Sequence, residues 1–105
     1  MSIDVVNNRE AGRFEVTLDG EQAIADYRIT RGGIVFSHTE TPDAFRGRGV
    51  AGALAREGLK FARELDLKVI PLCSFFAAYI ARHPEHLDQV HPRYLDRVKE
   101  AGEKA

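Results

Sequence analysis

Along residues 1–40, apolar and polar side chains tend to alternate, and this period of two is typical of β-strands with one buried face. Asp19-Gly20 and Gly32-Gly33 are typical of the tight turns that join antiparallel strands. The pattern predicts a meander of four antiparallel strands over Ile3–Asn7, Arg13–Leu18, Ala23–Thr30 and Ile34–Glu40. One face of the third strand is expected to carry Ala23, Ala25, Tyr27 and Ile29.

After residue 49 the apolar residues follow helical spacing, which predicts a helix from about Gly49 to about Leu65. The short apolar run Lys68–Cys73 then predicts a buried strand. A strand, a helix and a further strand normally form a right-handed crossover, so Lys68–Cys73 is expected to lie parallel to Ile34–Glu40. We expect this parallel pair near the middle of a mixed sheet.

The last third of the chain predicts two more helices. Ser74 is a good N-cap for a helix over Phe75–Arg82, which Pro84 ends. Pro92 is expected to start a last helix, Arg93–Gly102, and the tail Glu103–Ala105 is expected to fray. The chain is therefore interpreted as one α+β domain over residues 1–105.

Composition excludes several classes of protein. A net charge of -1 provides no basic field for nucleic acid, and a single cysteine excludes an internal disulfide framework. No apolar run is long enough to cross a membrane, and Met1-Ser2-Ile3-Asp4 does not resemble a signal peptide. We expect a soluble cytoplasmic protein without nucleic-acid or membrane partners, as a monomer or weak homodimer.

The segment Arg46-Gly47-Arg48-Gly49-Val50-Ala51 joins the fourth predicted strand to the first predicted helix. Glycines let backbone N–H groups approach a ligand, and a helix N-terminus adds free N–H groups and a positive dipole end. With two arginines beside it, this loop predicts a phosphate or pyrophosphate site. The alternative is an ordinary loop with a glycine-rich helix start.

The same loop matches a dinucleotide-binding fingerprint, Gly47-x-Gly49-x-x-Gly52, but its context does not fit. Thr41–Phe45 separates the glycines from the preceding strand, and the next strand ends Pro71-Leu72-Cys73 without the expected acid. We therefore disfavour a nicotinamide cofactor.

Two reactive side chains are expected at the same edge of the sheet as this loop. His38 and Cys73 lie at the carboxyl ends of the two parallel strands, where ligands collect in such sheets. A histidine can act as a general base near neutral pH, and a helix N-terminus favours a thiolate. The alternatives are a hydrogen-bonded strand histidine and a small buried cysteine.

Four motifs in order resemble a minimal subfamily, about one hundred residues long, of the GNAT N-acetyltransferase superfamily. They are His38-Thr39-Glu40, Arg46-Gly47-Arg48-Gly49, Pro71-Leu72-Cys73 and His83-Pro84-Glu85, and the resemblance covers about residues 13–90. The run Arg46-x-x-Gly49-x-Ala51, which begins with the second motif, resembles the acetyl-CoA-binding motif of the superfamily.

The resemblance implies how acetyl-CoA would bind. Backbone groups near Thr39 and Thr41 would pair with the pantetheine arm, and the amides from Arg46 to Ala51 would hold the pyrophosphate. Arg46 and Arg48 would add positive charge. The thioester would then lie between the two parallel strands, beside His38 and Cys73.

The resemblance also implies transfer of an acetyl group to a primary amine by direct attack, with His38 as base. Tyr79 lies where many GNAT enzymes have a tyrosine that protonates the CoA thiolate; a core tyrosine is the alternative. The asparagine often found before that helix is absent. Cys73 could act on the leaving thiol, take the acetyl group itself, which is the less usual route, or serve only in the core.

The sequence does not identify the amine that accepts the acetyl group. Larger relatives shape its site with helices between their first strands, whereas Asn7–Arg13 has room only for a turn. A protein lysine, a terminal amine or a small amine could therefore bind. A non-catalytic CoA-binding or protein-interaction module is the alternative function. The spacing of His83, His86, His91 and Cys73 matches no zinc pattern, so no metal is expected.

Overall fold

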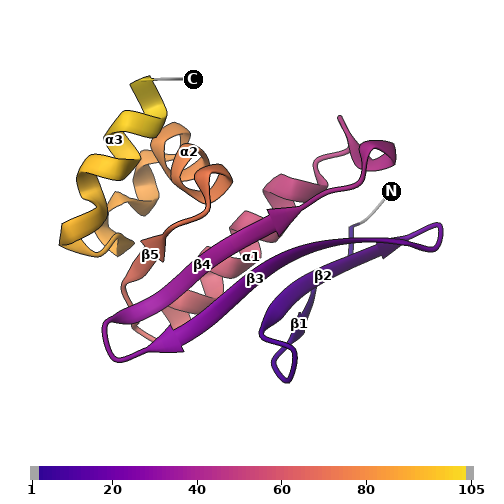
Figure 1. The fold of residues 1–105 in the computed structure, drawn as a ribbon, viewed down its shortest axis with the longest axis horizontal. Coiled ribbons are helices and arrows are strands. Elements are labelled where there is room, and N and C mark those ends of the chain that lie inside the picture. The colour runs from indigo at the N-terminus through magenta and orange to yellow at the C-terminus, as the bar shows by residue number, and fades with distance from the viewer. Residues whose placement is uncertain (1–2, 104–105) are drawn as a thin grey trace.

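A computed structural model describes residues 3–103 and shows a five-stranded sheet with three α-helices (Figure 1). The strands are β1 (Val6–Asn8), β2 (Arg13–Leu18), β3 (Glu21–Thr30), β4 (Gly33–Glu40) and β5 (Val69–Pro71). The helices are α1 (Val50–Glu64), α2 (Ser74–Arg82) and α3 (Leu95–Glu103). Short 3₁₀ helices cover Asp43–Phe45, Pro84–Gln89 and Pro92–Tyr94. None of the helices within residues 3–103 is long and apolar enough to span a bilayer.

The predicted mixed α+β fold is confirmed. The strand order is β1-β2-β3-β4-β5, with antiparallel pairing from β1 to β4 and parallel pairing between β4 and β5. The parallel pair lies at the edge of the sheet, so the expectation that it would lie near the middle was wrong. Beyond β5 the chain forms helices instead of another strand. The outer side of β5 is covered by a single bridge, Val69 to Val90, and by Arg97, which donates to the carbonyls of Pro71 and Leu72.

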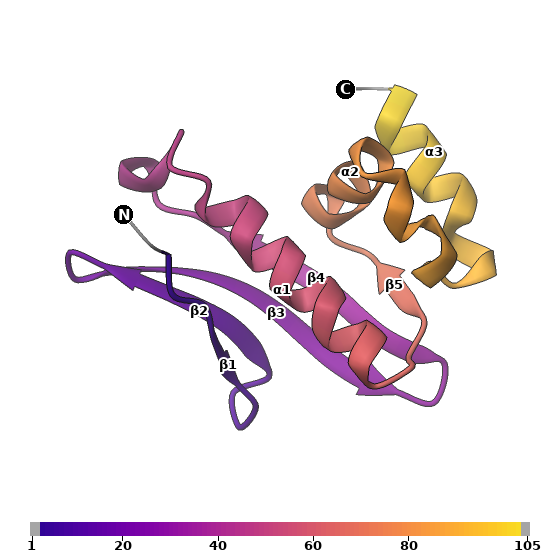
Figure 2. The same cartoon turned by 180° about the vertical axis from the view of Figure 1, so that it is seen from behind.

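Helix α1 lies across one face of the sheet, and the opposite face of β1–β3 carries no helix (Figures 1 and 2). Leu54 and Leu59 of α1 are fully buried. A Cβ on Gly58 would lie 2.9 Å from Cε1 of Phe36, so the helix approaches β4 closely at this point. The Phe36 ring stacks on Phe76 of α2 at 4.2 Å between centroids, which joins β4, α1 and α2 in one core.

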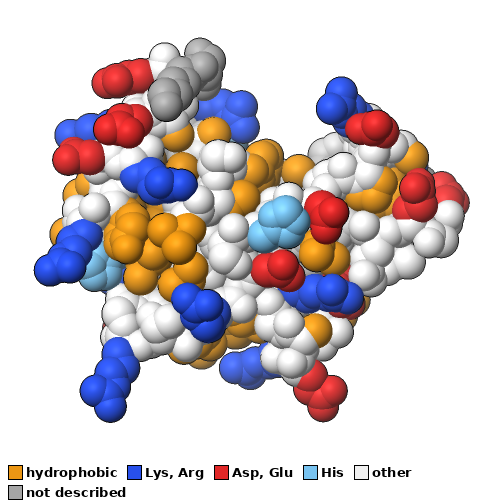
Figure 3. All heavy atoms as spheres, viewed as in Figure 1, with side chains coloured by type: hydrophobic (Ala, Val, Ile, Leu, Met, Phe, Trp, Pro, Cys, Tyr) orange, Lys and Arg blue, Asp and Glu red, His pale blue; other side chains and the backbone are white. Residues whose placement is uncertain are grey.

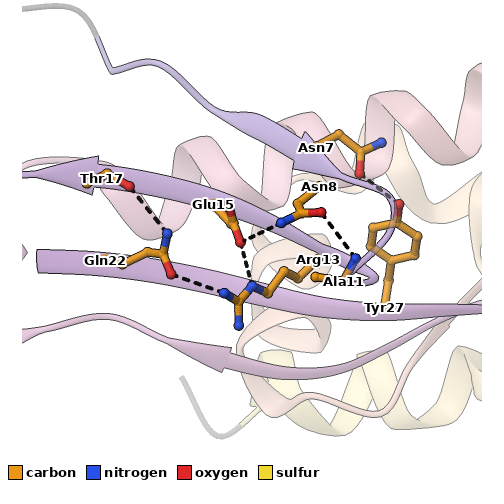
Figure 4. Close-up of polar contacts among 8 residues, drawn as sticks. All are labelled: Asn7, Asn8, Ala11, Arg13, Glu15, Thr17, Gln22 and Tyr27. Carbon is orange, nitrogen blue, oxygen red and sulfur yellow. Dashed lines mark hydrogen bonds and ion pairs between the residues drawn. The ribbon is translucent and has the colours of Figure 1, made fainter.

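The face without a helix carries a polar network over β1, β2 and β3 (Figure 4). Glu15 accepts hydrogen bonds from Arg13 and Asn8, and the amide of Gln22 connects the side chains of Arg13 and Thr17. Because Phe14 and Val16 alternate with these residues and are buried on the other face, the predicted half-buried strand is confirmed. Only a turn separates β1 from β2.

A register shift in the sheet decides which side chains of β4 face α1. Asp26 pairs with His38 but Tyr27 pairs with Phe36, so β4 contains one extra residue, Ser37, at this point. Side chains of paired residues share a face, and Tyr27 packs against Phe61 of α1 at 5.6 Å. Phe36 and Thr39 therefore both lie on the α1 side, although they are three residues apart.

Several predicted boundaries differ from the structure. The first strand is Val6–Asn8 rather than Ile3–Asn7. Cys73, not Ser74, is the N-cap residue of α2, and it provides no side-chain cap because a thiol is a weak acceptor. Pro92 begins a 3₁₀ turn in which Nδ1 of His91 accepts from the Arg93 amide. The last α-helix therefore begins at Leu95 and includes Glu103, and the remainder of the tail expected to fray lies outside the described residues.

Ile29 does not share the buried environment of Ala23, Ala25 and Tyr27. Its exposed fraction is 47%, whereas the two alanines are fully buried. It lies near the β3–β4 turn and borders a surface depression beside Arg9 and Gly12 that no helix fills. The expected common buried face therefore ends at Tyr27.

Candidate functional site

A cavity of about 420 Å³ opens where the end of β4 meets the loop before α1. This volume lies within the range of small-molecule sites. Its lining comes from β4, from the loop, from the first turn of α1 and from one side chain of α2. The residues are Thr39, Thr41, Phe45, Arg46, Gly47, Gly49, Val50, Ala51, Gly52 and Phe75.

The backbone of the loop requires glycine at two positions. Gly47 and Gly49 have φ angles of 74° and 77°, in the left-handed region that disfavours a Cβ. A Cβ at either position would meet nothing within 4 Å, so conformation and not space explains both glycines. Gly49 is the N-cap of α1, and its carbonyl accepts from the Ala53 amide at 3.0 Å.

These turns leave a group of backbone N–H donors beside the cavity. Among the described residues, no acceptor is found for the N–H groups of Gly47, Gly49, Val50 and Ala51. The N–H groups of Arg46 and Arg48, in contrast, donate to the carbonyls of Asp43 and Phe45 at 3.1 and 3.2 Å. The donors that remain can bind an anion at the positive end of the α1 dipole.

The two arginines of the loop differ in position. Arg46 borders the cavity with its side chain 84% exposed, and its Nε lies 3.6 Å from a carboxylate oxygen of Asp43. Arg48 does not line the cavity; its guanidinium lies 5.9 Å from the Phe45 ring centroid and 3.9 Å from Asp19. Arg46 is therefore the nearer positive charge for an anion in the cavity.

Cys73 lies at the point where β4 and β5 separate. Parallel pairing ends at Phe36 and Pro71, and the Cys73 amide then donates to the Phe36 carbonyl at 2.9 Å. The Cys73 Sγ is 3.1 Å from Oγ1 of Thr39, which lines the cavity. The predicted convergence of Cys73 with the glycine-rich loop is therefore seen, with Thr39 between them.

His38 lies on the other side of β4. Its neighbour Thr39 faces the cavity, whereas His38 faces the helix-free side and does not line the cavity. Its side chain is 57% exposed, and Nε2 lies 3.5 Å from Oε2 of Glu40. Figure 3 shows this face, with a histidine beside acidic side chains near its centre. His38 and Cys73 are thus at the same end of the sheet but on opposite faces of β4.

Tyr79 is close to the cavity without lining it. Its ring stacks on that of His83 at 4.0 Å between centroids, and His83 Nδ1 lies 2.8 Å from the Tyr79 carbonyl oxygen. On the other side, Cε2 of Tyr79 would be 4.0 Å from a Cβ on Gly52, a cavity residue. Tyr79 therefore lies next to a residue of the cavity wall without being part of that wall.

Three lining residues were not among the predicted site residues: Phe45, Gly52 and Phe75. The helical spacing of Phe75 and Tyr79, four residues apart, could have indicated that both approach the same site. No sequence pattern indicated that Phe45 lines the cavity, because its position depends on a 3₁₀ turn over Asp43–Phe45. Among the described residues, no group of three or more histidine, cysteine or acidic side chains could hold a metal ion.

Comparison with known proteins identifies relatives over most of the chain. A family model described as GCN5-related N-acetyl-transferase matches residues 13–90. Protein NATD1 of Xenopus tropicalis is 36% identical over 101 residues, which cover 93% of this chain and 87% of the relative. Protein NATD1 of Mus musculus and of Homo sapiens are each 37% identical over 100 residues, covering 92% of this chain and 86% and 83% of those proteins.

Proposed function

The chain belongs to the GCN5-related N-acetyltransferase family, and we propose that it transfers an acetyl group from acetyl-CoA to a primary amine. The observation that carries the proposal is the cavity at the start of α1, with the unpaired N–H groups of Gly47, Gly49, Val50 and Ala51 on its wall. Such donors fit the pyrophosphate of coenzyme A, and Arg46 is near enough to add charge.

The edge of β4 fits the pantetheine arm. Pairing with β5 stops at Phe36, so the backbone of β4 from Ser37 to Glu40 has no strand on that side. Thr39 and Thr41 lie along the cavity. An extended ligand arm could therefore pair with β4 as an added strand and place its sulfur near Cys73.

His38 is the proposed base. A neutral amine attacks the thioester carbonyl, a C–N bond forms, the C–S bond breaks, and the amine proton passes to His38. When bound, acetyl-CoA supplies the activated acyl group and a thiol leaving group. The proton that the leaving sulfur needs could come from Cys73 or Tyr79. Cys73 touches the cavity residue Thr39, and Tyr79 lies next to the cavity residue Gly52.

One observation favours a second candidate, a module that binds CoA without transfer. His38 faces away from the cavity and is 57% exposed, so it is not held in a closed catalytic site. In that case the cavity would bind CoA and no amine would be acetylated.

Thermal unfolding with CoA, acetyl-CoA or NAD tests the cofactor, and acetyl transfer to a panel of amines tests the reaction. We expect stabilisation by CoA and not by NAD. His38→Gln should reduce turnover about 100-fold while CoA affinity stays unchanged. His91→Gln, in the segment before α3, is the matched control and should behave as wild type. Absence of turnover with every amine, despite CoA binding, would favour the non-catalytic module.

A further inference from the structure

His38 has a carboxylate partner on its own strand. His38 and Glu40 are two residues apart in β4, on the same face of the strand, and Nε2 of His38 lies 3.5 Å from Oε2 of Glu40. Asp26 of β3 is paired with His38 in the register of the sheet. The extra residue Ser37 produces this register, since it turns His38 and Glu40 together toward the helix-free face.

The ring nitrogen of His38 that lies near Glu40 is Nε2, and this determines which nitrogen can act as the base. A carboxylate accepts hydrogen bonds and donates none, so Glu40 favours a ring in which Nε2 carries a proton. A neutral ring of that form has its lone pair on Nδ1. The nitrogen away from Glu40 is then the one that can accept a proton.

We propose that Glu40 is a positioning residue that acts through His38. It holds the proton on Nε2 and so directs the lone pair of Nδ1 to the amine that arrives across the helix-free face. During transfer, one N–H bond of the amine breaks and an N–H bond forms at Nδ1, while the C–N bond forms and the C–S bond breaks. The resulting imidazolium lies beside the carboxylate of Glu40 until Nδ1 releases its proton to water.

This inference rests on the proposed function, but its first test does not require turnover. In ¹⁵N NMR spectra, the chemical shifts of a histidine ring distinguish the nitrogen that carries the proton from the one with the lone pair. We expect His38 to be protonated mainly on Nε2 at about pH 8.5, above the ordinary titration range of histidine. Glu40→Ala should move the population toward Nδ1, and Glu10→Ala, an exposed acid in the β1–β2 turn, should not. An unchanged His38 spectrum in Glu40→Ala would overturn the proposal.

The second test is a double-mutant cycle measured by acetyl transfer at saturating acetyl-CoA. We expect Glu40→Ala to lower kcat about tenfold in the wild-type background and less than about twofold in the His38→Gln background. The Kd for CoA should remain within about twofold, since Glu40 does not line the cavity. Equal losses in both backgrounds, or no loss in the wild type, would show that Glu40 does not act through His38.

The two proposals fail in different ways. If the wild-type protein binds CoA but acetylates no amine of the panel, the non-catalytic module is favoured, and the role of Glu40 in transfer fails with the proposed function. If the wild type is active and His38→Gln is not, while Glu40→Ala retains full kcat, only the inference on Glu40 is wrong. Glu40→Ala is expected to fold, because the Glu40 side chain is 70% exposed.

Discussion

The Sγ atom of Cys73 lies 3.1 Å from Oγ1 of Thr39, across the gap that opens between β4 and β5. Cys73 follows the buried strand β5, and Thr39 lies on the wall of the proposed CoA cavity. This contact brings the one cysteine of the sequence to the end of the cavity where a thioester would be expected. The role of Cys73 can therefore be tested chemically.

Cys73→Ala should retain acetyl transfer within about tenfold of wild type if the amine attacks the thioester directly. Intact-mass spectrometry of the wild type incubated with acetyl-CoA alone should then show no acetylated enzyme. Cys73→Ser preserves a hydroxyl partner for Thr39 and serves as the control. An acetyl adduct on the wild type that is absent from Cys73→Ala would instead indicate a covalent route.

Gly49→Ala should weaken CoA binding, because a Cβ at a φ of 77° is strained and relaxation of the loop would redirect its N–H groups. A strain of about 1–2 kcal/mol is expected. Gly20→Ala is the matched control: its φ is 78°, it also meets no atom within 4 Å, and it lies in the β2–β3 turn. Calorimetric titration with CoA should separate the two variants, whereas urea unfolding should show a similar loss of stability in both.

Gly58→Ala should lower the free energy of unfolding by about 1–3 kcal/mol, because the new Cβ would overlap the Phe36 ring. Gly52→Ala in the same helix meets its nearest atom, in Tyr79, only at 4.0 Å. That variant should be neutral or more stable by up to about 1 kcal/mol, since alanine favours helix. Urea unfolding of both variants measures the difference. Equal stabilities would contradict the close packing of α1 on β4.

The stability of the sheet should depend on pH through Glu15. The hydrogen bond from Arg13 lowers the pKa of Glu15 below its ordinary value of 4.5, against an opposing effect of burial. A carboxyl with a lower pKa in the folded state stabilises the fold above its unfolded pKa, and this contribution is lost as the pH falls through the folded pKa.

Glu15→Gln should therefore be less stable than wild type near neutral pH, and the difference should shrink as the pH falls below 4.5 and through the lower pKa of folded Glu15. Urea unfolding at several pH values measures the effect. The control is Glu103→Gln at the end of α3. If the difference in unfolding free energy between wild type and Glu15→Gln did not change with pH, the charge on Glu15 would not contribute to stability.

Much of the fold and part of the site could be predicted from local patterns. The strand Arg13–Leu18 and the helix at Val50 follow from the spacing of apolar residues, because each period reflects the geometry of the neighbouring backbone. Seven of the eight residues predicted to bind the cofactor line one cavity, and the eighth, Arg48, does not line it. The glycine-rich loop could be identified because left-handed φ angles require a particular residue type.

The amino-acid sequence by itself determined the order and type of the main elements, and it identified the loop that starts α1. Only the tertiary structure decided that β5 is an edge strand and that His38 and Cys73 lie on opposite faces of β4. The physical reason is that both depend on partners distant in sequence. A strand's neighbours and its register are set by packing across the sheet, and one extra residue, Ser37, reverses the direction of every side chain that follows it in β4.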